Sequence, residues 1–377
     1  MRIVILCSSL FAKAGRLYEK EALSFRKACN EVVIIAPFNK KYEDQKGIKI
    51  YGLSKKRGYL DRLYINFLIM LKGLFTQADV WYCHDVDSLV VGIVLRLIKG
   101  GKVVFDCHEY FPEKQREKWG KKMKLLGEIM FHFVNLYERI FYRFTDAIVA
   151  VNAHMAGKLK RLHPAVFIFP NYPRLNFMQI EDNLKIVLPE KTILYIGGLN
   201  SNRNIHGVLH VLSILRKEYR CEAYFAVFGG GDSSYIEYLN TLAKDLGISE
   251  YFIYGGEIPY KEIPSVLKEA QIGIFLLNKK CLSHHWGESI KFFEYAAAGL
   301  PVIISDLPAK RRLLEIFKNG YAVDPTNEKL VAEICYKLIN NPHEAKKMGE
   351  SGRRCFLERY NWEAIEPEIE KLFLYLT

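Results

Sequence analysis

The sequence predicts an α/β protein built from two Rossmann-like domains that face each other across a cleft. Its 377 residues are enough for two or three domains, each with a core of its own. Short apolar runs alternate with helical patterns in both halves, which is typical of parallel sheets covered by helices on both faces. A segment with two prolines, residues 169–173, and a polar stretch to Glu190 separate the halves.

The elements follow one another in the order that this fold class requires. Runs of β-type residues predict the strands of the first half at Ile3–Leu6, Val32–Ala36, Ile48–Tyr51, Val80–Cys83, Lys102–Asp106 and Ala147–Ala150. Those of the second half are expected at Thr192–Ile196, Ala223–Phe228, Phe252–Tyr254, Ile272–Leu276, Pro301–Ile304 and Gly320–Val323. Helical periodicity is found at Leu17–Cys29, Gly207–Glu218, Tyr235–Leu246, Ile263–Ala270, Ser289–Ala298 and Leu330–Asn340.

The domain boundary is expected within the separating segment. We place the first domain at 1–172 and the second at 173–363, and expect a C-terminal helix, 364–377, to pack back onto the first domain. In such folds ligands bind beyond the carboxyl ends of the strands, so the site is expected in the cleft between the two sheets.

The composition excludes several classes of protein. Half of the residues are hydrophobic and 13% are aromatic, which is too apolar for a disordered chain. No apolar run reaches the ~18 residues that span a bilayer, and residues 1–7 are interpreted as a buried strand rather than a signal peptide. The eight cysteines have no paired spacing and are expected to be reduced, so we expect a cytoplasmic protein.

The positive charge is concentrated in the first half. Residues 1–178 carry 30 Lys and Arg against 16 Asp and Glu, a net charge of +14, whereas the remainder has a net charge of −2. Part of the excess lies in the basic segment 113–124, which also contains Trp119 and Met123. A solvated basic face, a nucleic-acid surface and an anionic membrane surface are the alternatives. The mixture of cations with Trp, Met and Phe favours the membrane, and no nucleic-acid signature is found.

Glycine turns predict a diphosphate site in the second half. Two predicted strands end in glycines, which let a ligand approach the backbone where free N–H groups favour an anion. These residues are Gly197, Gly198, Gly229, Gly230 and Gly231. Arg203 follows the first turn, and Lys291 and Glu294 share a helix face because they are three residues apart. Cations for phosphate and a carboxylate for vicinal hydroxyls match a sugar nucleotide, although tight loops and a surface ion pair would leave the same pattern.

Histidines follow two predicted strands of the first half. His84 is followed by Asp85 and His108 by Glu109, so both imidazoles are expected at the edge that opens into the cleft. They can hydrogen-bond a hydroxylated substrate, or be buried histidines with structural partners. Arg16, in the loop after the first strand, is expected to meet an anionic acceptor group or to be a solvated surface arginine.

Several motifs resemble the GT-B glycosyltransferases, in particular the retaining glycosyltransferase family 4. The most specific is Lys291–Val302, which resembles K-x-x-E-Y-x-A-x-G-x-P-V. Asp106–Glu109 resembles a D-x-H-E segment, Leu194–Leu199 with Arg203 a donor-domain segment, and Gly229–Asp232 a G-x-G-x turn. Asn319–Asp324 and Tyr360–Trp362 resemble late family markers, so the similarity covers nearly the whole chain.

The resemblance implies a role for each matching position. The first domain would bind the acceptor and the second the nucleotide-sugar donor. Glu294 would accept hydrogen bonds from ribose hydroxyls, Arg203 and Lys291 would neutralise the diphosphate, and His108 would contact the transferred sugar. The other donor-side positions are Gly256, Glu257 and Ile258 near the base, and Glu288, Ser289 and Ile290 at the helix start; Arg16, His84, Asp85 and Glu109 belong to the acceptor side. Two positions depart from the family pattern, because Gly287 replaces the first Glu of E-x7-E and Gly198 replaces a frequent arginine.

The expected function is therefore transfer of a sugar from a UDP- or GDP-linked donor to a lipid-linked saccharide, with retention, in bacterial cell-surface polysaccharide synthesis such as lipopolysaccharide or capsule. The enzyme is expected at the inner face of the plasma membrane, held by its basic first domain. No metal or other cofactor is expected, and Asp85-Val86-Asp87 is interpreted as acceptor-side or structural despite its D-x-D pattern. The alternatives are a nucleotide-sugar 2-epimerase and a degenerate transferase that only binds its ligand, the latter suggested by Gly287.

Overall fold

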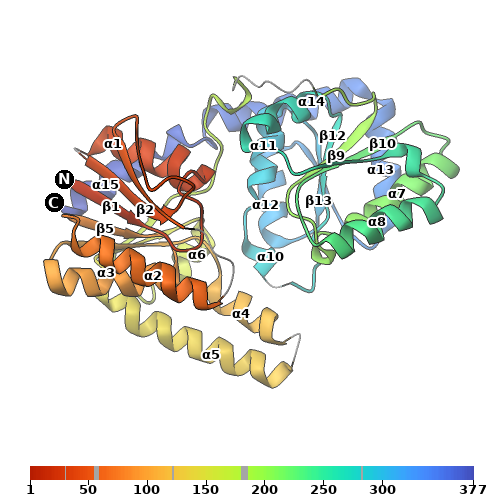
Figure 1. The fold of residues 1–377 in the computed structure, drawn as a ribbon. Coiled ribbons are helices and arrows are strands. Elements are labelled where there is room, and N and C mark those ends of the chain that lie inside the picture. The colour runs from red at the N-terminus through yellow and green to blue at the C-terminus, as the bar shows by residue number, and fades with distance from the viewer. Residues whose placement is uncertain (30, 55–58, 121–122, 180–185, 282) are drawn as a thin grey trace. The chain divides into compact units, whose positions relative to one another are not determined.

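A computed structural model describes residues 1–29, 31–54, 59–120, 123–179, 186–281 and 283–377 (Figure 1). The chain forms two compact units. Unit 1 contains Met1–Asn171 together with the C-terminal Trp362–Thr377, and unit 2 contains Tyr172–Asn361.

Unit 1 is built on an eight-stranded sheet. The strand order is β3-β4-β2-β1-β5-β6-β7-β8, and every neighbouring pair is parallel except β3 with β4. The central strands are almost entirely buried because helices cover both faces. The strands are β1 (Arg2–Leu6), β2 (Glu31–Pro37), β3 (Tyr42–Gln45), β4 (Ile48–Leu53), β5 (Val80–Cys83), β6 (Lys102–Cys107), β7 (Ala147–Ala150) and β8 (Val166–Ile168).

Alternate side chains of each strand in unit 1 point to opposite faces of the sheet, and each face packs against a layer of helices. Val4 and Leu6 of β1 belong to the apolar cluster that includes Ile69 of α2 and Leu89 of α3. On the other face, the ring of Phe25 in α1 lies 5.0 Å from Tyr82 and 5.2 Å from Phe373 of α15, so the C-terminal helix completes this layer. The helices of unit 1 are η1 (Gly15–Ala22), α1 (Leu23–Ala28), α2 (Tyr59–Leu74), α3 (Val86–Lys99), α4 (Phe111–Gly120), α5 (Lys124–Phe141), η2 (Tyr142–Phe144), α6 (Ala153–Leu159), η7 (Glu363–Ile365) and α15 (Glu366–Leu376).

Unit 2 is built on a six-stranded parallel sheet. Its strand order is β11-β10-β9-β12-β13-β14, so β9 occupies a central position and β10 and β11 follow on one side. Buried aliphatic and aromatic side chains of the strands and of the surrounding helices form one core. The strands are β9 (Thr192–Ile196), β10 (Tyr224–Phe228), β11 (Phe252–Gly256), β12 (Ile272–Phe275), β13 (Val302–Ser305) and β14 (Gly320–Val323).

The helices of unit 2 carry most of the residues that the sequence singled out. They are η3 (Phe177–Gln179), η4 (Ser201–Arg203), α7 (Ile205–Lys217), α8 (Ser233–Asp245), η5 (Ser249–Tyr251), η6 (Tyr260–Glu262), α9 (Ile263–Lys268), α10 (Ser283–Trp286), α11 (Ile290–Ala298), α12 (Pro308–Phe317), α13 (Glu328–Asn340) and α14 (Pro342–Glu358).

The predicted fold class is confirmed: both units are α/β, with essentially parallel sheets. Every strand expected from the sequence is present, with ends shifted by a residue or two. Two strands were not predicted: β3, which is polar and exposed at the sheet edge, and the short β8. In the described part of the chain, no helix is both long enough and apolar enough to cross a membrane.

Candidate active site

Two glycine turns lie against each other in unit 2, at the ends of β9 and β10. The N–H of Gly197 donates to the carbonyl of Phe228 at 2.8 Å. Both Gly197 and Gly229 have positive φ angles, +133° and +148°, which side chains rarely permit. A Cβ on Gly229 would lie 2.1 Å from the carbonyl oxygen of Gly197, so only glycine allows the two turns to approach this closely.

The third strand end, of β11, joins this pair. Gly229 donates its N–H to the carbonyl of Gly256 at 2.7 Å, and a Cβ on Gly230 would lie 3.0 Å from the carboxylate of Glu257. Gly231 lies beside Leu199, where a Cβ would be 2.4 Å from a carbonyl oxygen. A Cβ at Gly198 would instead meet just one atom, at 3.9 Å, so this position has room for the side chain that the family often carries there.

Lys291 reaches the first glycine turn from α11. A Cβ on Gly197 would lie 2.3 Å from Cε and 2.6 Å from Nζ of Lys291, so the glycine makes room for this ammonium. Burial, followed by the charge of Arg203, lowers the pKa of Lys291 to about 8, and Glu294 opposes this shift. The structure thus brings Arg203, Lys291 and Glu294 within electrostatic reach of one another, with Glu294 buried on the next turn of α11.

The start of α11 carries the other predicted donor-side positions. Ile290 is its first residue and Ser289 is its N-cap, with no side-chain capping bond. N–H groups in a first helical turn have no intrahelical partner, which favours an anion here. Burial raises the pKa of Glu288, against the opposing charges of Arg312 and Lys310. Ile258, after β11, packs at the edge of the core.

Lys310 was not identified from the sequence. This lysine of α12 is 2% exposed, and its Nζ donates to the carbonyl of His284 at 2.8 Å and to that of Gly287. Burial lowers its pKa to about 7, Glu288 raises it, and Arg203 and Lys291 lower it further. Lys310 therefore ties α12 to the segment before α11. Lys310 lies three and seven residues before the buried Leu313 and Phe317, which places it on the apolar face of α12. This spacing is the sequence pattern from which its burial could have been predicted.

In unit 1, the strand ends of β5 and β6 form a buried ion-pair network. Arg16 is 8% exposed and donates to both carboxylate oxygens of Asp106, at 2.8 and 3.0 Å, and to the carbonyl of Phe169 at 3.0 Å. It also lies 3.0 Å from Glu21. The alternative of a solvated surface arginine is therefore wrong, because Arg16 is buried and its donors have partners inside the unit; the contact with an anionic acceptor group stays a prediction.

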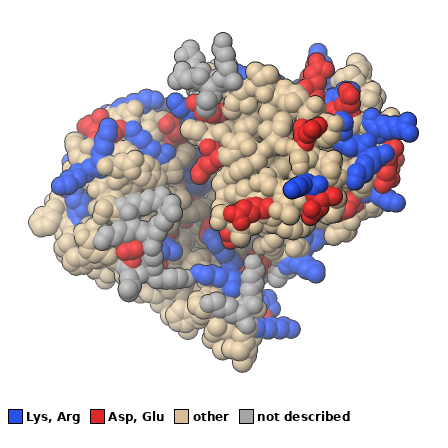
Figure 2. Space-filling view, turned by 45° about the vertical axis from the view of Figure 1, so that its right-hand side comes forward, with Lys and Arg blue, Asp and Glu red and all other residues tan. Residues whose placement is uncertain are grey.

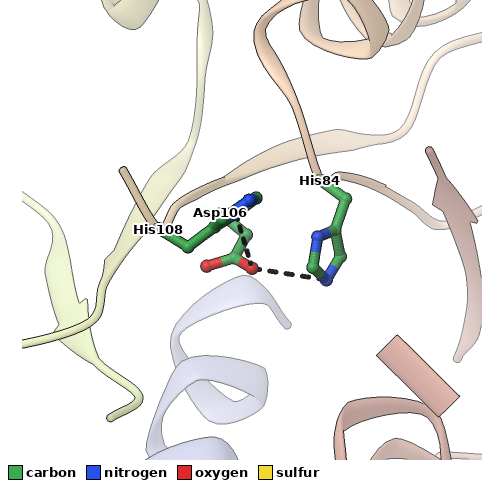
Figure 3. A group of neighbouring side chains, drawn as sticks. All are labelled: His84, Asp106 and His108. Carbon is green, nitrogen blue, oxygen red and sulfur yellow. Dashed lines mark ion pairs between the residues drawn. The ribbon is translucent and has the colours of Figure 1, made fainter. Parts of the chain in front are cut away.

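His84 belongs to the same network. Its Nε2 lies 2.6 Å from Glu21. The same nitrogen is 3.3 Å from Asp106 (Figure 3). Burial disfavours the charged imidazole, but the carboxylates of Glu21 and Asp106 outweigh it and raise the pKa of His84. Despite the burial of Asp106, the charges of Arg16 and His84 hold the pKa of that carboxyl well below its usual range. In the interior of unit 1, Asp106 thus lies beside two groups, Arg16 and His84, that favour its charged form.

His108 lies beside this network and is more exposed. Its Nδ1 is 3.6 Å from Asp106 Oδ2, and its ring centroid is 5.2 Å from that of His84 (Figure 3). Both histidines line a cavity of about 370 Å³ in unit 1. Asp85 and Glu109 also line it, together with Lys114 and Lys118 of α4.

Asp85 and Glu109 have protein partners at this cavity. The Asp85 carboxylate accepts from the N–H groups of Ser8 and Ser9, at 2.7 and 3.0 Å, and caps α3 through the N–H of Ser88. Asp87 of the D-x-D pattern pairs with Arg62 at 2.5 Å, and Glu109 pairs with Lys114. Asp85 therefore holds the loop after β1 in place.

A metal ion would have one candidate group in the described residues: His84, Asp106 and His108, whose ligand atoms lie within 4.8 Å of one another (Figure 3). A metal requires the neutral imidazole, whereas the neighbouring carboxylates favour protonated His84. Arg16 already occupies both oxygens of Asp106. The residues thus fit a network of ion pairs better than a metal site.

Two family models match this chain. The model described as "Glycosyl transferases group 1" matches residues 177–355, and that described as "Glycosyltransferase Family 4" matches residues 16–171. Together they cover most of both units. The chain is a GT-B glycosyltransferase of the family 4 type.

Individual relatives of this glycosyltransferase are distant. The GDP-mannose-dependent alpha-(1-6)-phosphatidylinositol monomannoside mannosyltransferase of Mycolicibacterium smegmatis is 28% identical over 152 residues, which cover 39% of this chain and 38% of that enzyme. The chain thus spans well under half the length of this curated relative. Sucrose-phosphate synthase from Thermosynechococcus elongatus has a similar fold, with a TM-score of 0.77 at 15% identity over 100% of this chain and 99% of that chain. Anabaena HepE, solved with UDP and glucose, gives a TM-score of 0.71 at 13% identity over 99% of each chain.

Proposed function

We propose that this glycosyltransferase moves a sugar from a nucleotide-sugar donor to a saccharide acceptor, with retention of the anomeric configuration and without a metal ion. The observation that carries the proposal is the placement of Lys291 against the glycine turn at 197, within the electrostatic reach of Arg203. The charge of Arg203 helps to lower the pKa of Lys291 in the free protein, and a bound diphosphate would supply the compensating negative charge.

Unit 2 would bind the donor. The N–H groups of the glycine turns and of the first turn of α11 suit the phosphate oxygens, and Glu294 would accept hydrogen bonds from the ribose hydroxyls. Gly256, Glu257 and Ile258 would contact the base. A GDP-mannose-dependent relative and a structural neighbour with UDP support a GDP- or UDP-linked donor.

The reaction needs little covalent chemistry from the protein. The bond between the anomeric carbon and the diphosphate oxygen breaks, and a bond to the acceptor oxygen forms on the same face of the sugar. The acceptor proton moves to the leaving phosphate oxygen, so no protein base is required. Arg203 and Lys291 would stabilise the charge that develops on the diphosphate, which is often the largest contribution to catalysis.

His108 would contact the transferred sugar near its anomeric carbon. Asp106 limits the orientation of this imidazole through the 3.6 Å contact with Nδ1, and Arg16 in turn fixes Asp106. His84 would act through the same network and is a positioning residue rather than a direct contact.

Unit 1 would receive a lipid-linked saccharide at the inner face of a bacterial plasma membrane, in the synthesis of a cell-surface polysaccharide. Its cavity of about 370 Å³ is lined by imidazole, carboxylate and ammonium groups that can hydrogen-bond sugar hydroxyls. A relative that acts on a phosphatidylinositol mannoside supports a lipid acceptor.

A thermal-shift screen of nucleoside diphosphates and sugar nucleotides tests the donor assignment. A ligand present at 100 times its Kd stabilises the protein by about 2.7 kcal/mol, which is enough to rank donors. Loss of the shift in Arg203→Ala and Lys291→Ala is expected, whereas normal shifts and turnover in both variants would overturn the assignment. Incubation of the preferred donor alone distinguishes an epimerase, which would convert it, from a transferase, which needs an acceptor.

A further inference from the structure

Helix α5 exposes a continuous row of large apolar side chains. Its members are separated along the sequence by four, four, three and four residues, so they lie on one side of the helix. Their exposed fractions range from 45% to 65%, and Phe144, just beyond the helix, is 51% exposed. The row consists of Leu125, Ile129, Phe133, Leu136 and Ile140.

The opposite side of α5 is fixed to unit 1, so the row cannot turn inward. Gly127, Val134 and Glu138 are buried, and the hydroxyl of Tyr137 donates to the carbonyl of Val86 at 2.9 Å. A helix anchored on one side and apolar on the other is typical of a surface that something else covers.

The charges on α5 define the partner. Lys124, Arg139 and the adjacent Arg143 are exposed, and within the described part of the chain no ion pair involves them. The two acids of the helix do not face solvent freely, because Glu138 is buried and Glu128 pairs with Arg116 at 2.6 Å. The exposed side of α5 is therefore apolar and cationic. On the face that Figure 2 draws, Lys and Arg lie among Asp and Glu.

Helix α2 has a second such row. Leu63, Phe67, Leu71 and Phe75 recur every four residues, with exposed fractions from 39% to 87%. Both helices contact the start of α3, α2 through the Arg62–Asp87 ion pair and α5 through the bond to Val86.

We propose that the exposed side of α5, which we call the α5 face, docks unit 1 on an anionic lipid bilayer. Apolar side chains inserted at the level of the headgroups, with arginine and lysine beside them, match the chemistry of such a surface. A symmetric pairing of two copies through this face is disfavoured, because among the described residues the unpaired charges on it are all cations, and those of the two copies would face each other.

This docking deepens the proposed function, on which its link to the acceptor depends. Helix α4 is held to α5 by the Arg116–Glu128 pair and contributes Lys114 and Lys118 to the cavity wall. A bilayer in contact with α5 therefore lies near the cavity that would receive a lipid-linked saccharide. The basic segment 113–124 was expected to make this contact itself, but Lys114 and Arg116 are occupied by ion pairs, and residues 121 and 122 lie outside the described residues.

Vesicle flotation with the full chain tests the proposal. We compare vesicles of phosphatidylcholine with vesicles containing about one third phosphatidylglycerol, at low and high salt. The wild type is expected to float with the anionic vesicles. Ile129→Ser/Phe133→Ser and Arg139→Glu/Arg143→Glu are each expected to reduce binding at least tenfold. The control is Leu374→Ser on α15, an apolar residue outside the α5 face that is even more exposed, at 75%, and this variant should bind normally.

The outcomes separate the docking proposal from the proposed function. Equal binding by the α5 variants, or a wild type that sediments as a dimer and ignores vesicles, would overturn the docking proposal. Circular dichroism and melting temperatures check that each variant is folded. Transfer to a short water-soluble saccharide should be unchanged in the α5 variants. A wild type that binds anionic vesicles but transfers no sugar would contradict the proposed function alone.

Discussion

The low pKa of Lys291 predicts that nucleoside diphosphates bind more weakly as the pH rises. Burial and the charge of Arg203 lower this pKa to about 8 in the free protein. A bound diphosphate adds negative charge and restores the ammonium form, so binding takes up a proton above pH 8. Between pH 7.5 and 9.5 the protonated fraction falls roughly 25-fold, which weakens binding by the same factor, about 2 kcal/mol.

Isothermal titration calorimetry with UDP or GDP measures this dependence directly. Titrations in buffers with different ionisation enthalpies also give the number of protons taken up. In Lys291→Met the dependence should become much flatter over this range, while Lys244→Met, an exposed lysine at the end of α8, is the control and should behave like the wild type. Wild-type affinity that does not change with pH, or a dependence that persists in Lys291→Met, would refute the reasoning.

The same burial predicts a gain in stability when Lys291 is removed. The folded pKa of about 8 lies below the ordinary value of 10.5, so the ammonium form is destabilised by folding. This cost is fully present below pH 8 and disappears as the pH rises towards 10.5. Lys291→Met should therefore raise the free energy of unfolding at pH 7, by up to about 3 kcal/mol, while it abolishes transfer. Denaturant melts at pH 7 and 10 check this, and a variant less stable than the wild type at pH 7 would contradict it.

Three further predictions follow from the buried networks. Arg16→Met leaves the carboxylates of Glu21 and Asp106 without their cation, and should destabilise the protein by about 3–5 kcal/mol in denaturant melts; an unchanged midpoint would contradict the network. In NMR titrations His84 should remain protonated above pH 6.5, so its contribution to stability is lost as the pH rises through its folded pKa. Burial and the charge of Lys158 should instead make His154 titrate below pH 6.5. A His154 that titrates at higher pH than His84 would contradict both assignments. Lys310→Met removes the hydrogen bonds that Nζ donates to the carbonyls of His284 and Gly287, and should loosen the segment before α11; amide exchange of 284–290 that matches the wild type would contradict the positioning role.

Removal of metal gives a separate expectation. Because the neighbouring carboxylates favour protonated His84 and both oxygens of Asp106 accept from Arg16, transfer should continue in excess EDTA. Loss of activity that Mn²⁺ restores would contradict this assignment.

The sequence predicted the fold well because the strands are buried on both faces. Apolar runs such as Val32–Ala36 stand out at once, and a parallel sheet requires helices between them. The strand β3 was missed because Tyr42–Gln45 is polar and exposed, and is paired at the sheet edge by contacts that no local pattern reveals.

The site was harder to predict because much of it depends on contacts between distant residues. The glycine turns and Lys291 could be proposed from local motifs. Arg16 could not be assigned, because its partner Asp106 lies 90 residues away. Lys310 looked like one of three adjacent basic residues until its burial became visible. Likewise, the sequence alone does not tell which side of α5 faces solvent.

The central claim is that unit 2 holds a diphosphate between the glycine turns, Arg203 and Lys291. The most direct test is the difference in affinity between a nucleoside diphosphate and its nucleoside, measured by calorimetry at pH 7. Two charge-assisted contacts predict that the diphosphate binds at least about a hundredfold more tightly, and that this preference nearly disappears in Arg203→Ala/Lys291→Met. A preference of the same size in the double variant would contradict the claim.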